Sequence, residues 1–125
     1  MLMDQVDKLH KGETKKPERI LIHCLAGRGR TGTAMAIINS IMSLQWQILN
    51  LDQASIGVPI TAANVKDHLK MSVFSTVRRL RIQRATAVQA SSQYNYIYHF
   101  VDTWLTQKIK ATKFVEKSNE FKCKE

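Results

Sequence analysis

A short segment rich in glycine and arginine carries the residue types that can hold and attack a phosphate group. Its glycines Gly27 and Gly29 allow the backbone to curl tightly, and a curled loop turns successive N–H groups inward to form an anion-binding nest. Arg30 can hold two phosphate oxygens through its planar fork of N–H donors. The segment therefore predicts a bound phosphate, and it reads His23-Cys-Leu-Ala-Gly-Arg-Gly-Arg-Thr-Gly-Thr33.

Cys24 is expected at the mouth of this nest, with its sulfur facing the phosphate. Cationic surroundings and the N-terminal end of a following helix stabilise a thiolate, which lowers the pKa of the thiol below its free value of ~8.5. A thiolate that faces a phosphate is a nucleophile, so the residue types predict phosphoryl transfer onto sulfur. A lone cysteine after a buried strand is more often a small core residue, but the complete segment argues against that reading. An ATP-binding loop is not indicated, because the segment lacks Gly-Lys-Ser/Thr at the start of the helix.

The elements expected to position this loop are a strand before it and helices after it. The mostly apolar run from Arg19 to His23 precedes the glycines and predicts a buried strand. Ser72 is a suitable N-cap for a later helix, and the apolar residues of the last long helix recur at helical spacing. The helical patterns cover residues 1–10, 31–43, 61–70, 72–84 and 91–110, whereas residues 44–60 fit no single element.

The loop resembles the signature of the protein tyrosine phosphatase family, His-Cys-x-x-Gly-x-x-Arg-Ser/Thr, at every fixed position. It continues into the Gly-Thr that is typical of the tyrosine-specific branch. A second segment, Leu80-Arg-Ile-Gln-Arg-Ala-Thr-Ala-Val-Gln-Ala-Ser-Ser-Gln-Tyr94, is similar to the family's Leu-Arg-x-Gln-Arg-x-x-x-Val-Gln-x-x-x-Gln-Tyr.

The resemblance implies an α/β fold, of which this chain holds the C-terminal portion: a strand, the phosphate-binding loop and then mostly helices. It covers most of residues 1–110, with a poor match over residues 44–70. We therefore expect a partial catalytic domain over residues 1–110 and a basic, flexible tail over residues 111–125.

The resemblance also implies a role for individual residues. Cys24 would be the nucleophile, Arg30 would grip the phosphate, and Thr31 would steady the sulfur as a leaving group. Gln89 would orient the water that hydrolyses the cysteinyl phosphate. The loop residues that bind phosphate would be Cys24, Leu25, Ala26, Gly27, Arg28, Gly29 and Arg30, and the supporting residues would be His23 and Gln93. Arg81 and Arg84 would be structural.

Complete family members also have a Trp-Pro-Asp loop, whose acid protonates the departing tyrosine oxygen. Neither Trp46 nor Trp104 is followed by Pro-Asp, and Asp4 and Asp7 fall on the helix that follows the acid loop in relatives. We therefore expect dephosphorylation of phosphotyrosine proteins to be impaired, and the missing N-terminal part of the domain to be a candidate partner. The alternative is a non-catalytic, phosphotyrosine-binding or regulatory fragment, a pseudophosphatase.

Composition restricts the compartment and the partners. The chain has 125 residues, 44% of them apolar, with a net charge of +9, and contains no apolar run long enough to span a bilayer. Acids follow Met1 where a signal peptide would be basic, and Cys24 and Cys123 make no disulfide framework, so we expect a cytosolic protein. The spacing of cysteine and histidine indicates no zinc site, and no cofactor is expected. A nucleic-acid-binding role for the arginines of residues 78–84 is disfavoured, because no nucleic-acid-binding motif accompanies them.

Overall fold

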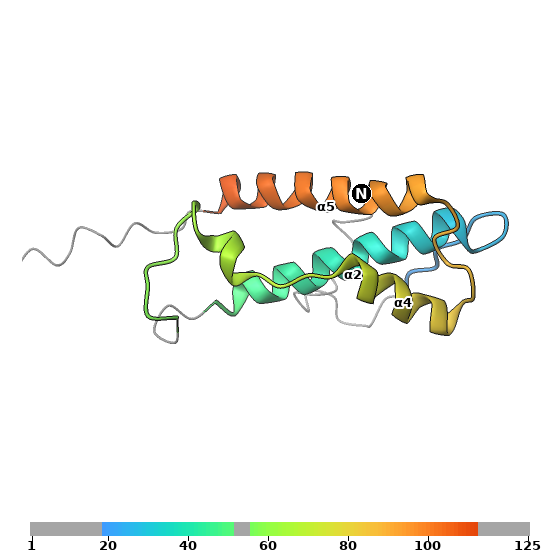
Figure 1. Cartoon of the computed structure of the whole chain (residues 1–125), viewed down its shortest axis with the longest axis horizontal. Coiled ribbons are helices and arrows are strands. Elements are labelled where there is room, and N and C mark those ends of the chain that lie inside the picture. The colour runs from blue at the N-terminus through green and yellow to red at the C-terminus, as the bar shows by residue number, and fades with distance from the viewer. Residues whose placement is uncertain (1–18, 52–55, 113–125) are drawn as a thin grey trace, which may run out of the picture.

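The computed structural model describes residues 19–51 and 56–112, and this part of the chain is built from helices (Figure 1). The elements are α2 (Gly29–Leu49), the 3₁₀-helix η1 (Val65–His68), α4 (Val73–Gln83) and α5 (Ser91–Ala111). The helix expected over residues 1–10 and most of the basic tail expected over residues 111–125 lie outside the described residues.

Helix α2 is the centre of the fold, because it packs against both α4 and α5. The apolar face of α4 covers one side of α2 and that of α5 covers another, so the core is continuous across the three helices. Both α2 and α5 begin at the end of the molecule where the loop lies (Figure 1). The buried core side chains are Ala36, Ile37, Ile41 and Leu44 of α2, Val73, Val77 and Leu80 of α4, and Ile97 and Val101 of α5, together with Ala87 and Val88.

A second, smaller apolar cluster lies at the other end and joins η1 to the last turns of α5. Ile60, Val65 and Ile109 are its buried members. The side-chain amide of Gln47 ties the end of α2 to the chain after η1: it donates to the carbonyl of Lys70 at 2.8 Å and accepts from the Lys70 N–H at 2.7 Å. The Gln47 side chain thus satisfies both the N–H and the carbonyl of Lys70, which lies outside the helices and has no helical hydrogen bonds.

The two later helices confirm the sequence predictions. Helix α4 begins at Val73 after Ser72, whose hydroxyl accepts a hydrogen bond from the Ser75 N–H at 3.2 Å, as an N-cap does. Helix α5 occupies Ser91–Ala111, within one residue of the range that the apolar periodicity indicates.

Two other helices differ from the predicted ranges. Helix α2 begins two residues earlier than expected and continues to Leu49, because residues 44–49 contain no glycine or proline. Of the short helix expected over residues 61–70, only the 3₁₀-helix η1 (Val65–His68) is present. The Asn64 side chain accepts from the Thr61 N–H at 2.8 Å and donates to the Pro59 carbonyl at 2.8 Å. Such side-chain bonds to the backbone compete with an α-helix.

The buried strand expected over residues 19–23 does not form in the structure, so this prediction is corrected. These residues have no regular secondary structure, and Leu21 is 86% exposed. A strand is stabilised by hydrogen bonds to a neighbouring strand, and no second strand occurs within residues 19–51 and 56–112. The helical part fits the C-terminal portion of the predicted domain, but the α/β class is not confirmed.

Candidate active site

The predicted phosphate-binding loop leads into α2 and is closed by a left-handed turn. Gly27 has a φ of +67°, a conformation that costs glycine little and strains other residues. Beside it, the guanidinium of Arg84 donates a hydrogen bond from Nη2 to the carbonyl of Ala26 at 3.0 Å. Arg84 thus holds the backbone of the loop, and the structural role that the resemblance implied for it stays a prediction.

The sulfur of Cys24 lies inside this loop and collects hydrogen-bond donors. The Thr31 hydroxyl donates to Cys24 Sγ at 2.9 Å. This bond and the backbone N–H groups of Thr31, Gly27 and Arg28 lower the pKa of Cys24 from 9.0 to about 6, against the opposing effect of partial removal from water. The N-terminal ends of α2 and α5, which lie at this end of the molecule, favour negative charge in the same direction (Figure 1).

The connection between α4 and α5 is held against the loop by backbone contacts. The carbonyl of Arg28 accepts a hydrogen bond from the Val88 N–H at 3.1 Å. The close approach requires a glycine on α2, because a Cβ atom at Gly32 would stand 2.7 Å from the Val88 nitrogen. Arg81 donates from Nε to the Ala87 carbonyl and from Nη2 to the Val88 carbonyl, both at 2.9 Å.

Val88 itself has an unusual backbone conformation, with a φ of 61°. This left-handed region is strained for a β-branched residue, and such strain persists where surrounding contacts fix the chain. Here the Val88 side chain is buried, its N–H bonds to Arg28 and its carbonyl accepts from Arg81. Val88 directly precedes Gln89, so the contacts that hold Val88 also fix the direction in which the backbone continues to Gln89.

The side chains of the two predicted glutamines, Gln89 and Gln93, both reach the start of α2. A Cβ atom at Gly29 would stand 2.8 Å from Gln93 Nε2 and 3.0 Å from Gln89 Oε1, so both amides reach this glycine. Gln93 Oε1 also accepts from the N–H groups of Gln89 at 2.9 Å and Ala90 at 3.1 Å. Gln93 therefore positions the backbone of Gln89, while the Gln89 side chain stays exposed beside the loop.

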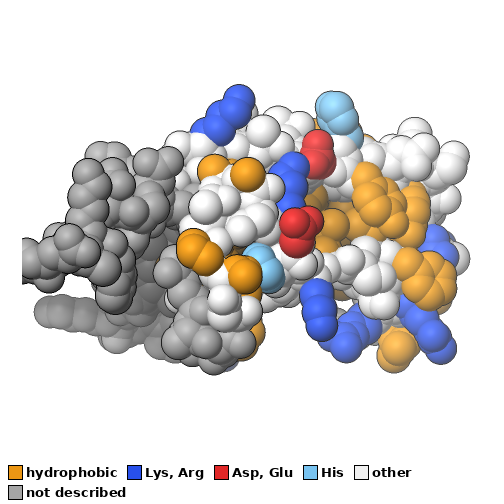
Figure 2. Space-filling model, turned by 60° about the vertical axis from the view of Figure 1, so that its left-hand side comes forward, with side chains coloured by type: hydrophobic (Ala, Val, Ile, Leu, Met, Phe, Trp, Pro, Cys, Tyr) orange, Lys and Arg blue, Asp and Glu red, His pale blue; other side chains and the backbone are white. Residues whose placement is uncertain are grey.

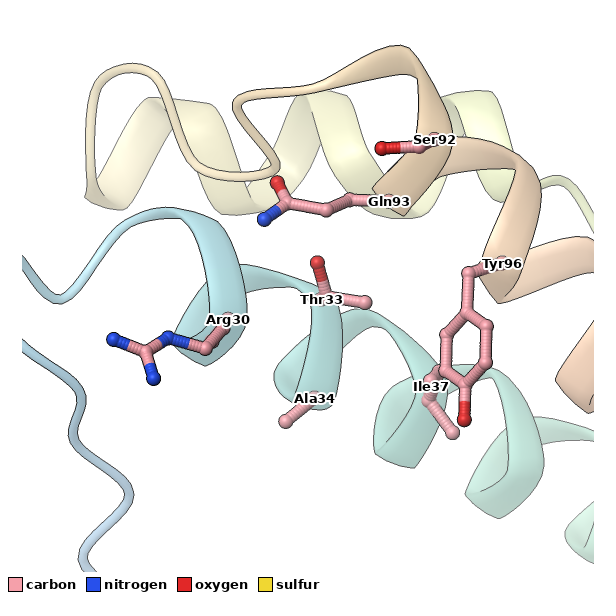
Figure 3. A pocket seen from close by; sticks show the side chains of 7 residues that line it. All are labelled: Arg30, Thr33, Ala34, Ile37, Ser92, Gln93 and Tyr96. Atoms are coloured by element: carbon pink, nitrogen blue, oxygen red, sulfur yellow. The ribbon is translucent and has the colours of Figure 1, made fainter.

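The structure brings together most, but not all, of the side chains that the sequence singled out. Cys24, Thr31, Gln89 and Gln93 meet around the loop. Arg30 stands on the first turn of α2, and its side chain extends past the N-terminal end of the helix (Figure 3). Leu25 is 96% exposed. His23 is also exposed and makes no side-chain hydrogen bond to the described residues, so its supporting role stays a prediction.

A separate cavity of about 440 Å³ lies between α2 and α5 (Figure 3). Ala34, Ile37 and Tyr96 give it an apolar wall, and Cys24 is not among its lining residues. No sequence pattern assigns Tyr96 to a site, because its position on α5 lies outside the apolar stripe. The residues that line this cavity are Arg30, Thr33, Ala34, Ile37, Ser92, Gln93 and Tyr96.

Comparison with known proteins identifies the family. The sequence pattern of the family described as "Protein-tyrosine phosphatase" matches residues 1–103. The chain belongs to the protein-tyrosine phosphatase family. This match extends over all the loop and glutamine residues described above, and no solved structure matches the chain.

Individual protein-tyrosine phosphatases align with the same region. The chain is 28% identical over 100 residues to human tyrosine-protein phosphatase non-receptor type 18, an alignment that covers 80% of this chain and 18% of the relative. Mouse tyrosine-protein phosphatase non-receptor type 9 is 34% identical over 88 residues, covering 70% of this chain and 11% of the relative. Rat receptor-type tyrosine-protein phosphatase epsilon is 31% identical over 86 residues, covering 69% and 9%. The chain thus spans less than one fifth of the length of these phosphatases.

Residues 19–51 and 56–112 contain neither a membrane-spanning helix nor a group of side chains suited to a metal ion. None of the helices in residues 19–51 and 56–112 combines the length and the apolar character needed to cross a membrane. Within the same residues, no group of three or more histidine, cysteine or acidic side chains could hold a metal ion.

Proposed function

We propose that this chain is a cysteine-dependent protein tyrosine phosphatase and that Cys24 is its nucleophile. The observation that carries the proposal is the convergence of the Thr31 hydroxyl and three backbone N–H groups on Cys24 Sγ, with a pKa of about 6. A thiol with this pKa is roughly 90% ionised at pH 7, whereas a thiol at its ordinary value is roughly 1% ionised. The loop that ionises the sulfur is also shaped to hold a phosphate against it.

In the first step the Cys24 thiolate attacks the phosphorus of a phosphotyrosine. The S–P bond forms as the P–O bond to the tyrosine oxygen breaks, and the electron pair goes to that oxygen, which takes up a proton. The loop N–H groups and the Arg30 guanidinium would hold the equatorial oxygens while charge shifts among them. This step leaves a phosphocysteine.

In the second step a water molecule attacks the phosphorus of the phosphocysteine. The O–P bond forms, the S–P bond breaks with its electron pair going to sulfur, and inorganic phosphate leaves with both protons of the water, which restores the thiolate. The Thr31 hydroxyl, 2.9 Å from Sγ, stabilises the departing sulfur. Gln89 would orient the water, since its amide oxygen lies beside Gly29 and its backbone is fixed by Gln93.

The proton for the tyrosine oxygen limits this chemistry. The acids within the described residues are Asp67 and Asp102, and neither lines a hollow next to the loop. Asp67 belongs to η1, at the opposite end of the molecule from the loop (Figure 1). Asp102 is ion-paired with Lys66 at 3.6 Å. We therefore propose slow turnover of phosphotyrosine proteins of the cytosol, because neither acid of the described residues is placed to supply this proton, and a site without a general acid loses about 10²–10⁴ in rate.

The same observation favours a second candidate, a phosphotyrosine-binding module without turnover. The loop would bind the phosphate in both cases, and only the fate of the tyrosine–oxygen bond differs. The affinity for phosphate therefore does not distinguish the two candidates. The rate of phosphoryl transfer from substrates with different leaving groups does.

The test is single-turnover phosphorylation of Cys24 by a series of substituted phenyl phosphates, followed by mass spectrometry of the protein. Acidic phenols depart without a proton, so labelling should be fast with nitrophenyl phosphate and should fall steeply as the leaving-group pKa rises towards ~10, the value of tyrosine. Cys24→Ser is the control and should remain unlabelled. If the folded chain binds vanadate but no phenyl phosphate labels it, the binding module is correct and the enzyme is not.

A further inference from the structure

The cavity between α2 and α5 has an apolar end and a polar end (Figure 3). The apolar end is formed by Ala34 and Ile37 of α2 and the ring of Tyr96 of α5. The polar end is formed by Arg30 and Gln93, which stand on the first turns of the two helices. The volume of about 440 Å³ lies within the range of about 300–1,000 Å³ that is typical of small-molecule sites. The cavity thus has the size and the two-ended lining that suit a small amphiphilic molecule.

The apolar end is held in place by contacts within each helix. The Tyr96 ring packs against Phe100, one turn further along α5, with 6.0 Å between the ring centroids. The hydroxyl of Thr33 donates to the Gly29 carbonyl at 2.7 Å, so this residue offers the cavity its methyl group. Ile37 is buried in the core. An apolar ligand would therefore gain contacts here without leaving these polar groups unpaired.

The polar end offers positive charge and hydrogen-bond donors. The Arg30 side chain is exposed, and a guanidinium stays protonated at any physiological pH. The side-chain oxygen of Gln93 accepts from the N–H groups of Gln89 and Ala90, which leaves its Nε2 group as a donor. The N-terminal ends of α2 and α5 add partial positive charge. Together these groups favour an anion at this end of the cavity.

The charge of the surrounding surface also favours an anion. Asp67 and Asp102 are the acids within residues 19–51 and 56–112, and neither lines the cavity. On the face shown in Figure 2, acidic side chains occupy one area near the middle, whereas basic side chains are spread more widely. A negatively charged ligand is therefore attracted to the described part of the chain, and a positively charged one is disfavoured.

We propose that this cavity is a regulatory site for a small amphiphilic acid. The apolar ring or chain of the ligand lies against Ala34, Ile37 and Tyr96, and its carboxylate or similar anionic group binds Arg30. Cys24 does not line the cavity, so the ligand does not meet the nucleophile. Arg30 lines the cavity and would also hold the phosphate of the nest, so the ligand competes with phosphate for one guanidinium. This competition rests on the proposed function of the loop.

The experiment compares two fluorescent probes on the full chain. Anilinonaphthalene sulfonate has an aromatic body and a permanent negative charge, and phenylnaphthylamine has the same aromatic body without the charge. Both become brighter in apolar surroundings, so a titration gives the dissociation constant of each. The charged probe should bind about threefold to tenfold more tightly, because a charge-assisted contact that is exposed to solvent contributes only modestly.

Vanadate, which resembles phosphate, measures the competition for Arg30. At a vanadate concentration about ten times its own dissociation constant, the apparent dissociation constant of the charged probe should rise about tenfold. The neutral probe does not use Arg30, so its dissociation constant should not change. Arg30→Met should bring the two probes to equal affinity. Arg79→Ala, which removes an exposed arginine of α4 outside the cavity, should preserve the preference for the charged probe.

Two variants test whether the probes occupy the cavity. Tyr96→Ala removes one wall and Ala34→Leu fills the space, so each should weaken the binding of both probes about fivefold. Tyr98→Ala is the matched control, because Tyr98 is a similarly exposed tyrosine of α5 that does not line the cavity. Circular dichroism monitors the helices. Leucine is a good helix former, so Ala34→Leu carries the test if Tyr96→Ala unfolds the chain.

Four results would contradict parts of the proposal. Binding of neither probe, or binding that both cavity variants leave unchanged, would overturn the site. Equal affinity of the two probes for the parent chain would overturn its anionic end. If vanadate binds in calorimetry but does not displace the charged probe, the competition for Arg30 is wrong. If the probes bind in the cavity and vanadate does not bind the folded chain at all, the proposed function of the loop is wrong and the cavity site stands.

Discussion

The pKa of Cys24 is the property that depends most directly on the loop geometry, and Thr31→Val isolates its principal cause. The Thr31 hydroxyl, 2.9 Å from Cys24 Sγ, makes the largest contribution to the lowering of the pKa to about 6. Valine keeps the branched shape of threonine and the backbone N–H of residue 31, so the variant removes only the hydroxyl donor. The pKa of Cys24 should therefore rise.

The expected size of the rise follows from the number of donors. A carboxylate that accepts two or three N–H bonds has its pKa lowered by about two units, so one bond corresponds to about one unit. Starting from a pKa of about 6, the loss of one donor at pH 6 would reduce the thiolate from roughly half of the molecules to roughly a tenth. Alkylation follows the thiolate fraction, so its rate at pH 6 should fall about fivefold, whereas at pH 9 the two proteins should react at similar rates.

Iodoacetamide labelling of Cys24 between pH 4.5 and 9.5, followed by mass spectrometry in a Cys123→Ser background, measures this directly. Because the pKa of Cys24 is depressed in the folded protein, the thiolate is present above about pH 6 and is lost as the pH falls through that value. Thr31→Ser keeps the hydroxyl and should titrate like the parent protein. If Thr31→Val and the parent protein titrate at the same pH, the hydroxyl does not stabilise the thiolate. If both titrate near 9, the nest around the sulfur is not formed.

Two further predictions concern the phosphate and the packing of the loop. Arg30→Lys keeps the charge but loses the planar fork, so the affinity for vanadate in calorimetry should fall roughly tenfold, and Arg79→Lys should not change it; an equal affinity would remove Arg30 from the site. Gly32→Ala should lower the free energy of unfolding in urea by about 1–2 kcal/mol, although alanine favours helices, because the new Cβ would meet the Val88 nitrogen at 2.7 Å. Asn39→Ala, at an exposed position of α2, is the matched control, and unfolding of Gly32→Ala at the same urea concentration as the parent would contradict the close approach.

The parts of the fold that the sequence predicts well are those that depend on neighbours along the chain. The Ser72 cap bonds to an N–H three residues away, and the range of α5 follows from the periodicity of its own apolar residues. The strand expected over residues 19–23 failed for the opposite reason, since an apolar run becomes a strand only when another strand accepts its hydrogen bonds. The bonds from Gln47 to Lys70 join residues 23 positions apart, and no local pattern indicates them.

The sequence by itself determined which reactive groups the loop holds, because the cysteine, the glycines, Arg30 and Thr31 lie within eight residues of one another and their spacing fixes what a tight turn can bring together. Only the tertiary structure decided how the loop is supported. Arg84 and Val88 reach it from more than 50 residues away, and the strained backbone of Val88 sets the position of Gln89. These arrangements depend on how α2, α4 and α5 pack, and packing is decided by the contacts of many distant residues at once.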